Sequence, residues 1–251
     1  MHLTKRQFGR FSRLVYQECG INLHAGKQQL LQARLAKRLR QTGIESVDEY
    51  LHCIENNHEE RTHFFDAVST NHTFFFRERQ HFECLKKGSL NIWCAAASSG
   101  EEPYSVAIDC LEKGFSPMIL ATDISTYVLE LGERGIYGIE KAKGTPAYIL
   151  KKYFQKGQRK WEGYIKVRDE VKKIVKFGRF NLLTDPMPTI EFDVIFCRNV
   201  LIYFDQITKT KVVNRLYSAL KRGGYFVIGG AESLNNISHP YKYLKPSIYV
   251  K

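Results

Sequence analysis

The sequence lacks the features that mark metal-binding, membrane-spanning and secreted proteins. None of its six cysteines belongs to a CxxC pair, which argues against a zinc ribbon or a thioredoxin-type redox site, and we predict no metal site. No apolar run approaches the ~18–20 residues that cross a bilayer, and the N-terminal MHLTKRQFGRF has no apolar core of a secretory signal. We therefore expect a cytoplasmic protein without membrane insertion, and we expect most of its cysteines to be reduced packing residues.

The composition is that of an ordinary globular protein. Of the 251 residues, 43% are apolar and 25% are charged, which is typical of soluble domains. This length suits one large domain, or a small domain joined to a medium one. Nothing in the sequence indicates an obligate dimer, so we expect a monomer.

The net charge of +12 is unevenly distributed along the chain. Residues 1–42 hold nine Lys/Arg and one acid, residues 43–69 hold one base and seven acids, and residues 151–179 hold eleven bases and three acids. Two basic patches of this size favour a polyanionic partner, which could be nucleic acid, an anionic membrane or an acidic protein surface. Solubilising charge without a partner is the plain alternative.

The first 69 residues are expected to be helical. LTKRQFGRFSRLVYQECG places apolar residues near a 3.6-residue period, and Gly20 can end that helix. KQQLLQARLAKRLRQTG ends at Gly43 and aligns Leu31, Leu35 and Leu39 on one side. Ser46 opens a further helix with a capping-box spacing. We predict four short helices and no strand here.

After residue 87, short apolar runs alternate with helical stretches. Strand candidates are 90–96, 118–123, 173–177, 192–197, 225–230 and 247–250. Such alternation predicts an α/β fold with a doubly wound, mostly parallel sheet covered by helices on both faces. The alternation is interrupted by KKYFQKGQRKWEGYIKVRDEV. We interpret this segment as a small inserted β-structure with a turn between Gly157 and Gly163. We divide the chain into a helical domain (1–69), a linker (70–87) and an α/β domain (88–251) with a β-subdomain inserted at 152–168.

Three expected strand ends carry polar residues, and ligands of doubly wound sheets bind beyond the carboxyl ends of strands. The first end is CAAASSGEEPYS, a turn of small residues with a single glycine and no GxGxxG. Its two glutamates would repel phosphate and suit a cationic ligand. The second end is Asp123, placed to accept both hydroxyls of a ribose. The third is FDVIFCRNVLIYFD, where Arg198, Asn199 and Tyr203 follow an apolar strand. A cationic nucleoside without phosphates, S-adenosylmethionine, fits all three.

The stretch TNHTFFFRERQHF (70–82) combines three consecutive phenylalanines with residues that can hydrogen-bond. We interpret it as the joint between the helical and α/β domains, folded over the cofactor. Its phenylalanines would fix the joint by packing, while Asn71, Thr73 and Arg77 would face the ligand. The plain alternative is an ordinary core segment with Arg77 on a helix surface.

Seven segments taken together resemble the CheR-type chemotaxis receptor methyltransferases. They are, in chain order, TNHTFFFRE, WCAAASSGEEPYSVAI, ILATDIS, RGIY, FNLL, FDVIFCRNVLIYFD and LKRGGYFVIGGAESL. The resemblance spans roughly residues 1–250. It implies an all-α N-terminal domain followed by a Rossmann-like S-adenosylmethionine-dependent methyltransferase domain with a small inserted β-subdomain. It also implies methyl transfer to glutamate carboxylates on the helical cytoplasmic bundle of chemoreceptors, with S-adenosylhomocysteine as the product.

The resemblance also implies site residues. Cofactor contacts are expected from Asn71, Thr73, Arg77, Glu101, Asp123, Asn181, Leu182, Asn199 and Val200, and catalytic roles from Arg77 and Tyr203. The chain departs from the family pattern at Ala231, where a histidine is usual, and we leave that segment out of the predicted site. The loop GQRKWEG replaces a glycine-rich loop, so docking on a receptor's C-terminal pentapeptide is not expected.

The basic helix around Arg34, Lys37 and Arg38 is the expected docking surface for the acidic methylation region of a receptor. A basic RNA or DNA methyltransferase would also explain the net charge. The chain has no NPPY-type motif and no cysteine in a nucleophile loop, so we do not expect a nucleic-acid substrate. A non-catalytic module that only binds the cofactor is the other alternative, and the presence of Asn71, Arg77 and Glu101 argues against it.

Overall fold

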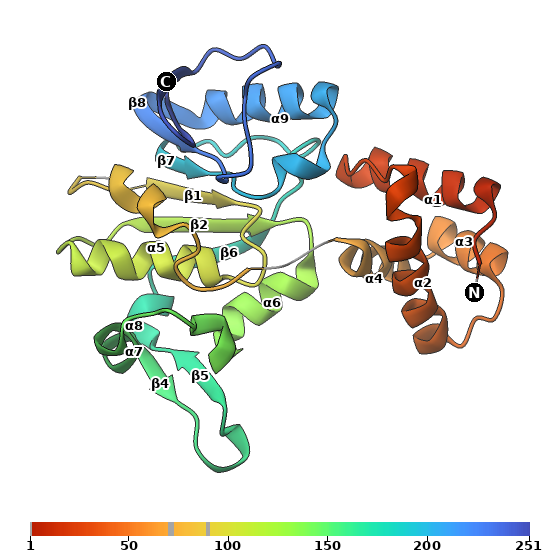
Figure 1. The fold of residues 1–251 in the computed structure, drawn as a ribbon, viewed down its shortest axis with the longest axis horizontal. Helices are drawn as coiled ribbons and strands as arrows, with labels where there is room; N and C mark the ends of the chain where they lie inside the picture. Colours follow the sequence, from red (N-terminus) through yellow and green to blue (C-terminus); the bar gives the residue numbers. More distant parts are fainter. Residues whose placement is uncertain (1, 70–72, 89–90) are drawn as a thin grey trace.

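The computed structural model describes residues 2–69, 73–88 and 91–251 (Figure 1). Four helices occupy the N-terminal part: α1 (Lys5–Cys19), α2 (Gln28–Thr42), α3 (Val47–Asn56) and α4 (His58–Val68), with a single 3₁₀ turn, η1 (Ala25–Lys27), before α2. Thr4 and Gln7 form a capping box at the start of α1, and Gly20 ends that helix in the left-handed conformation. Leu31, Leu35 and Leu39 are all buried, as their spacing predicted.

These helices enclose their own hydrophobic core, which includes Phe11, Leu31, Tyr50 and Phe64. Within it a buried carboxylate, Glu60, accepts a hydrogen bond from Arg38 Nε at 3.0 Å and another from the Tyr50 hydroxyl. The Arg38 guanidinium is therefore committed to a buried ion pair inside the helical part. This placement argues against the expected use of Arg38 in receptor docking.

A seven-stranded sheet forms the centre of the remaining chain. Its spatial order is β6-β2-β1-β7-β8-β10-β9, and the strands are β1 (Asn91–Ala95), β2 (Met118–Asp123), β6 (Val175–Arg179), β7 (Phe192–Phe196), β8 (Leu220–Val227), β9 (Lys242–Lys245) and β10 (Ile248–Val250). The first five in this order run parallel, and β10 pairs antiparallel with both β8 and β9. The chain reverses its direction of winding between β1 and β7, which is where doubly wound sheets bind ligands.

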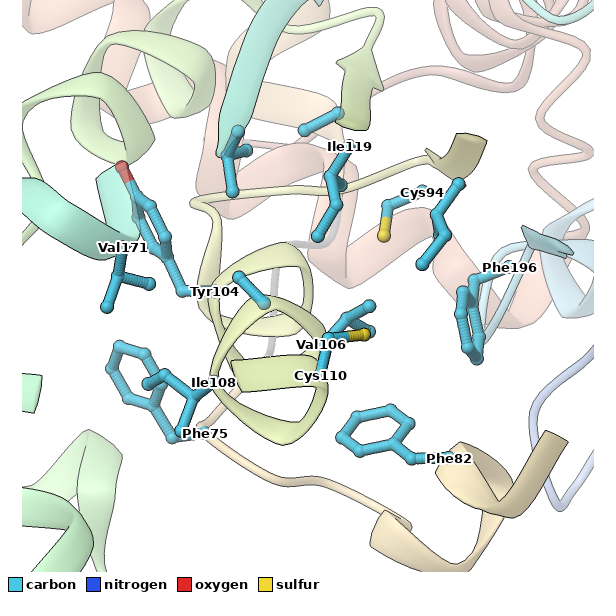
Figure 2. Packing of buried hydrophobic residues seen from close by; sticks show 14 of the residues in the cluster. Phe75, Phe82, Cys94, Tyr104, Val106, Ile108, Cys110, Ile119, Val171 and Phe196 are labelled. Atoms are coloured by element: carbon cyan, nitrogen blue, oxygen red, sulfur yellow. The ribbon is translucent and has the colours of Figure 1, made fainter. Parts of the chain in front are cut away.

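Helices cover both faces of this sheet (Figure 1). Helices α5 (Glu101–Glu112) and α6 (Thr126–Arg134) lie on one face, and α9 (Gln206–Ala219) lies on the other. Figure 2 shows Val106, Ile108 and Cys110 of α5 pointing into the cluster that also holds Cys94 and Phe196 of the sheet. All six cysteines are free, and all but Cys53 are buried, in agreement with the packing role expected for most of them. Within the described parts of the chain, no helix is both long and apolar enough to cross a membrane.

A small second sheet, of order β3-β5-β4, projects from the same side as α5 and α6 (Figure 1). It consists of β3 (Ile136–Gly138), β4 (Phe154–Lys156) and β5 (Tyr164–Val167), with short helices η3 (Ile139–Ala142), α7 (Ala147–Tyr153), η4 (Arg159–Trp161) and α8 (Asp169–Lys172) around it. The turn between β4 and β5 lies at 157–163, where it was expected. The sequence did not reveal β3, a three-residue strand in RGIY, or β9, which follows a long irregular stretch.

The buried ion pair of the helical part makes a testable prediction. Arg38→Ala leaves the Glu60 carboxylate without its cation in a low-dielectric core, so the free energy of unfolding should fall by about 2–3 kcal/mol. Lys37→Ala, an exposed neighbour on the same helix, should change it by less than about 0.5 kcal/mol. Urea denaturation monitored by far-ultraviolet circular dichroism measures both changes. An Arg38→Ala protein as stable as Lys37→Ala would contradict a stabilising role of the Arg38–Glu60 ion pair.

Candidate active site

A pocket lies at the carboxyl edge of the sheet, beside the point where the winding reverses. Its walls come from the ends of β1, β2, β6 and β7, from residues 73–82, and from the end of α1. Of the residues predicted to contact the cofactor, Thr73, Arg77, Asp123, Asn181, Leu182, Asn199 and Val200 line it, as does the predicted catalytic residue Tyr203. Asn71 lies outside the described residues. Residues far apart in the sequence thus meet at one site.

Asp123 is the last residue of β2, and its carboxylate faces the turn after β1. Its Oδ2 accepts from the Ser98 backbone N–H at 2.8 Å and its Oδ1 accepts from the Ser125 backbone N–H at 3.1 Å. Burial raises the pKa of this carboxyl, although the backbone N–H groups partly oppose the rise. Each oxygen keeps further lone pairs, so the carboxylate can accept the two hydroxyls of a ribose.

The turn after β1 is shaped for close approach of a ligand. Ala96, Ser98 and Gly100 all have positive φ, at 70°, 49° and 92°, and a Cβ on Gly100 would lie 3.0 Å from the Gly132 Cα. Among the described residues, the buried Ser98 Oγ has no hydrogen-bond partner, and Ser98 lines the pocket. A buried hydroxyl without a partner is costly unless a ligand satisfies it. The small side chains and this hydroxyl fit a bound nucleoside.

The glutamate pair that begins α5 does not meet the sequence-based expectation. Glu101 is fully buried and lies outside the pocket lining; its carboxylate accepts from Ser99 Oγ at 2.7 Å and lies 3.1 Å from Lys141 Nζ. The same ammonium donates to the Thr73 carbonyl at 2.7 Å. Glu101 therefore supports the Thr73 segment through Lys141 instead of facing the pocket.

Glu102, which the prediction passed over, does line the pocket. Burial raises the pKa of its carboxyl, and its Oε2 accepts from Arg198 Nη1 at 2.6 Å. Both glutamates are thus paired with cations inside the protein. The sequence analysis expected both carboxylates to suit a cationic ligand, and it could not foresee that Lys141 and Arg198 pair with them.

Arg198 is the centre of a buried charge cluster. Its side chain is 1% exposed, and besides Glu102 it donates through Nη2 to the Glu78 carboxylate at 3.1 Å and to the Arg77 carbonyl at 2.6 Å. Glu78 in turn accepts from the Gly230 backbone N–H at 3.0 Å. The guanidinium therefore holds the main chain beside Arg77 against the loop that follows β7.

Residues 73–78 cover the pocket, and Phe75 and Phe76 pack against the hydrophobic core beneath them. Phe75 is 2% exposed, and its ring makes edge contacts with Tyr137 and Phe154 at centroid distances of 5.0 and 4.9 Å. Phe74, by contrast, lines the pocket, and the Arg77 guanidinium lies 5.9 Å from its ring centroid. The stretch was expected to pack through its phenylalanines and to face the ligand through its polar residues. Phe75 packs and Thr73 and Arg77 line the pocket, but Phe74 lines it as well.

Glu232 is a site residue that the sequence analysis missed. Its Oε2 accepts from the backbone N–H groups of Gly229 at 2.6 Å and Asn199 at 2.9 Å, and its Oε1 accepts from Ile202 at 3.2 Å. It thus holds Asn199 at a φ of 59°, a conformation that side chains other than glycine rarely adopt. The signal was present in GGAES, which we omitted because Ala231 departs from the family pattern.

The end of α1 forms a wall of the pocket through Cys19 and Ile21. Ile21 and Phe204 form an antiparallel bridge, and the Asn22 backbone N–H donates to the Tyr203 carbonyl at 2.9 Å. Asn181 Nδ2 donates to the Glu18 carbonyl at 2.7 Å, so its amide joins the two parts of the chain. Burial raises the pKa of the Cys19 thiol to about 12, which keeps it protonated and unreactive.

The proposed docking residues lie on α2, outside this pocket. Lys37 is exposed and Arg34 is half-buried, while Arg38 is held by Glu60 as described above.

Asp123 makes the first prediction for the site. Asp123→Asn replaces one carboxylate oxygen by an N–H₂ group that opposes a backbone donor and cannot accept a ribose hydroxyl. The dissociation constant of S-adenosylhomocysteine should rise about 10- to 100-fold. Because the pKa of Asp123 is raised, binding to the wild type should weaken as the pH falls through that pKa, and the variant should lose this dependence. Calorimetric titration at several pH values tests both, and unchanged affinity would refute the ribose contact.

Glu232 makes the second prediction for the site. Glu232→Gln turns an N–H₂ group toward the backbone donors that hold residues 199–202, so the Asn199 loop should relax and S-adenosylhomocysteine should bind about tenfold more weakly. Glu191→Gln, an exposed carboxylate elsewhere on the surface, serves as the control and should bind normally. Equal affinities of the two variants would show that the loop does not need this carboxylate.

Comparison with known proteins agrees with the geometry. A family model described as CheR methyltransferase, SAM binding domain, matches residues 71–250, and one described as CheR methyltransferase, all-alpha domain, matches residues 6–69. Chemotaxis protein methyltransferase 2 of Pseudomonas aeruginosa is 37% identical over 99% of this chain and 94% of its own length. The chemotaxis protein methyltransferase of Escherichia coli is 37% identical over 98% and 91%, and that of Borreliella burgdorferi is 34% identical over 100% and 96%.

Similarity to solved structures is much weaker. The N-methyltransferase NodS of Bradyrhizobium japonicum is 14% identical and covers 61% of each chain with a TM-score of 0.37, too low to bear on function. The two family models instead confirm the predicted fold class, the predicted cofactor and the resemblance noted in the sequence. On this match and on identities of 34–37% over nearly its whole length, the chain belongs to the CheR methyltransferase family.

Proposed function

We propose that this protein transfers a methyl group from S-adenosylmethionine to glutamate side chains of chemoreceptors, giving glutamate methyl esters and S-adenosylhomocysteine. The observation that carries the proposal is the convergence in one pocket of Thr73, Arg77, Asp123, Asn199 and Tyr203. They come from three separate sequence segments of the family pattern. A pocket that offers the Asp123 carboxylate to a ribose and the Arg77 guanidinium to a carboxylate suits this pair of substrates.

The chemistry demands alignment more than proton transfer. Bound S-adenosylmethionine supplies a methyl group on a positively charged sulfur. One carboxylate oxygen of the substrate forms the new bond to the methyl carbon, and the carbon–sulfur pair of electrons stays on sulfur. The carboxylate is already ionised at neutral pH, so no general base is needed. The protein has to bring the two reactants into line and exclude water.

Arg77 and Tyr203 are the residues that we assign to this alignment. Arg77 lines the pocket, and its carbonyl is fixed by the buried Arg198. A guanidinium can hold a carboxylate through two parallel hydrogen bonds, and here it would hold the substrate glutamate or orient the cofactor so that its methyl faces that glutamate. Tyr203, on the opposite loop, would line the methyl path or donate a hydrogen bond to the attacking oxygen.

The remaining contacts are proposed on the same basis. Asp123 would bind the ribose, and Thr73, Asn181, Leu182, Asn199 and Val200 would contact the cofactor, with Asn71 as a further contact. Glu101 would not contact the cofactor; it would hold Lys141, which donates to the Thr73 carbonyl. Arg34 and Lys37 on α2 would dock the acidic methylation region of the receptor, without Arg38. The protein would work as a cytoplasmic monomer and would not dock on a receptor's C-terminal pentapeptide. Its functional divisions would be the helical domain (1–69), the linker (70–87) and the α/β domain (88–251), with the β-subdomain inserted at 152–168.

The proposal predicts a specific product. With tritiated S-adenosylmethionine and membranes that carry an overexpressed chemoreceptor, label should appear on the receptor as a base-labile ester and not on added RNA. Arg77→Ala should lower kcat about 100-fold, because the reactants lose their alignment. Arg222→Ala, an exposed arginine at the start of β8, is the matched control and should behave as the wild type.

Two results would count against the proposal. Base-stable label, or label on RNA alone, would exclude receptor ester formation. Cofactor binding without any transfer would point to a non-catalytic module. An Arg77→Ala protein that transfers methyl groups at the wild-type rate would remove Arg77 from the mechanism while leaving the activity itself established.

A further inference from the structure

Lys141 is a cation beside the active site that lies outside all seven family segments. It belongs to η3 (Ile139–Ala142), which directly follows β3 of the small second sheet. Its Nζ donates to the Thr73 carbonyl at 2.7 Å and lies 3.1 Å from Glu101 Oε1. One ammonium therefore joins the segment that covers the pocket to the first turn of α5.

The charge of Glu101 depends on this ammonium. Glu101 is fully buried, and its Oε2 accepts from Ser99 Oγ at 2.7 Å. Its Oε1 makes no hydrogen bond among the residues that the structure describes, so the Lys141 ammonium compensates the charge at this oxygen. A buried carboxylate that loses its cation is strongly destabilised. Glu101 therefore keeps the ammonium in place, although the Lys141 side chain is 32% exposed.

The second sheet contacts the same two walls of the pocket through Tyr137, in β3. The Tyr137 hydroxyl donates to the Ser99 carbonyl at 2.7 Å, in the turn after β1. Its ring makes an edge contact with Phe75 of the covering segment, and the Phe75 ring also packs on Phe154 of β4. The Phe75 backbone N–H donates to the Lys141 carbonyl at 2.9 Å. The second sheet and η3 thus hold the covering segment by ring packing and by hydrogen bonds.

The covering segment is held at both of its ends. Arg198 donates to the Arg77 carbonyl at 2.6 Å at one end, and Lys141 donates to the Thr73 carbonyl at the other. Thr73 and Arg77 line the pocket, whereas Lys141 does not. The ammonium is therefore placed to act on a bound cofactor through Thr73 and not by direct contact.

We propose that the small second sheet is part of the cofactor site and that Lys141 is its positioning residue. The ammonium holds the Thr73 carbonyl, and thereby the Thr73 side chain, in the place where it contacts the cofactor. This inference rests on the proposed function, because that function makes Thr73 a cofactor contact. Loss of the ammonium should weaken cofactor binding and leave the affinity for the receptor unchanged.

The test uses three variants that separate positioning from stability. Lys141→Met removes the ammonium and leaves the Glu101 carboxylate buried without its cation. Adding Glu101→Gln removes that charge as well, so the double variant should regain stability while its Thr73 carbonyl stays unheld. Lys143→Met, an exposed lysine two residues further along, is the matched control.

The expected results differ between affinity and stability. The dissociation constant of S-adenosylhomocysteine, measured by calorimetry, should rise about tenfold in Lys141→Met and in the double variant alike. The melting temperature should fall by about 5–10 °C in Lys141→Met, and the double variant should recover most of that loss. KM for S-adenosylmethionine should rise by about the same factor as the dissociation constant, while KM for the receptor stays within about twofold of the wild type. Lys143→Met should match the wild type in every assay.

The outcomes decide the inference separately from the proposed function. If the double variant regains wild-type affinity together with its stability, Lys141 serves only the fold and the inference fails. Wild-type affinity in Lys141→Met overturns it as well, and if that single variant does not fold, the double variant decides. A wild type that binds S-adenosylhomocysteine but forms no receptor methyl ester refutes the proposed function, and the dissociation constants of the variants still support or overturn the inference.

Discussion

The buried guanidinium of Arg198 is the interaction on which the pocket depends. Its partners come from two places: Glu102 from the first turn of α5, and Glu78 and the Arg77 carbonyl from the covering segment. Arg198 itself begins the loop after β7. One buried cation therefore joins three walls of the site, and loss of the Arg198 guanidinium would leave two carboxylates without their shared cation, which is strongly destabilising. The position of Arg77 follows from this cluster.

The helical part of the chain belongs to the same site. The end of α1 lines the pocket with Cys19 and Ile21, and the Tyr16 hydroxyl donates to Asp205 at 2.7 Å, at the start of α9. Contacts between α4 and α6 add to this interface. The segment between α1 and α2 is also paired with the segment that carries Tyr203, through the Ile21–Phe204 bridge and the Asn22 hydrogen bond to the Tyr203 carbonyl.

Residue patterns predicted the parts of this site that follow local rules. Asp123 could be placed because acids at the end of a second strand meet ribose in doubly wound sheets, and Leu31, Leu35 and Leu39 because their spacing matches a helix. The choice between Glu101 and Glu102 could not be made, since it depends on the rotation of α5 against the sheet. The Arg198 cluster could not be found either, because its partners lie 96 and 120 residues away. Glu232 was missed for another reason, because we left out GGAES on account of Ala231, which departs from the family pattern.

A crystal structure with S-adenosylhomocysteine tests the central claim most directly, namely that these walls enclose the cofactor. The account predicts ribose hydroxyls on the Asp123 carboxylate, the adenosine against the Ala96–Ser98 turn, and the sulfur directed toward the gap between Arg77 and Tyr203. Arg198 should keep its contacts with Glu78 and Glu102. Density for the ligand outside this pocket, or a ribose remote from Asp123, would contradict the account.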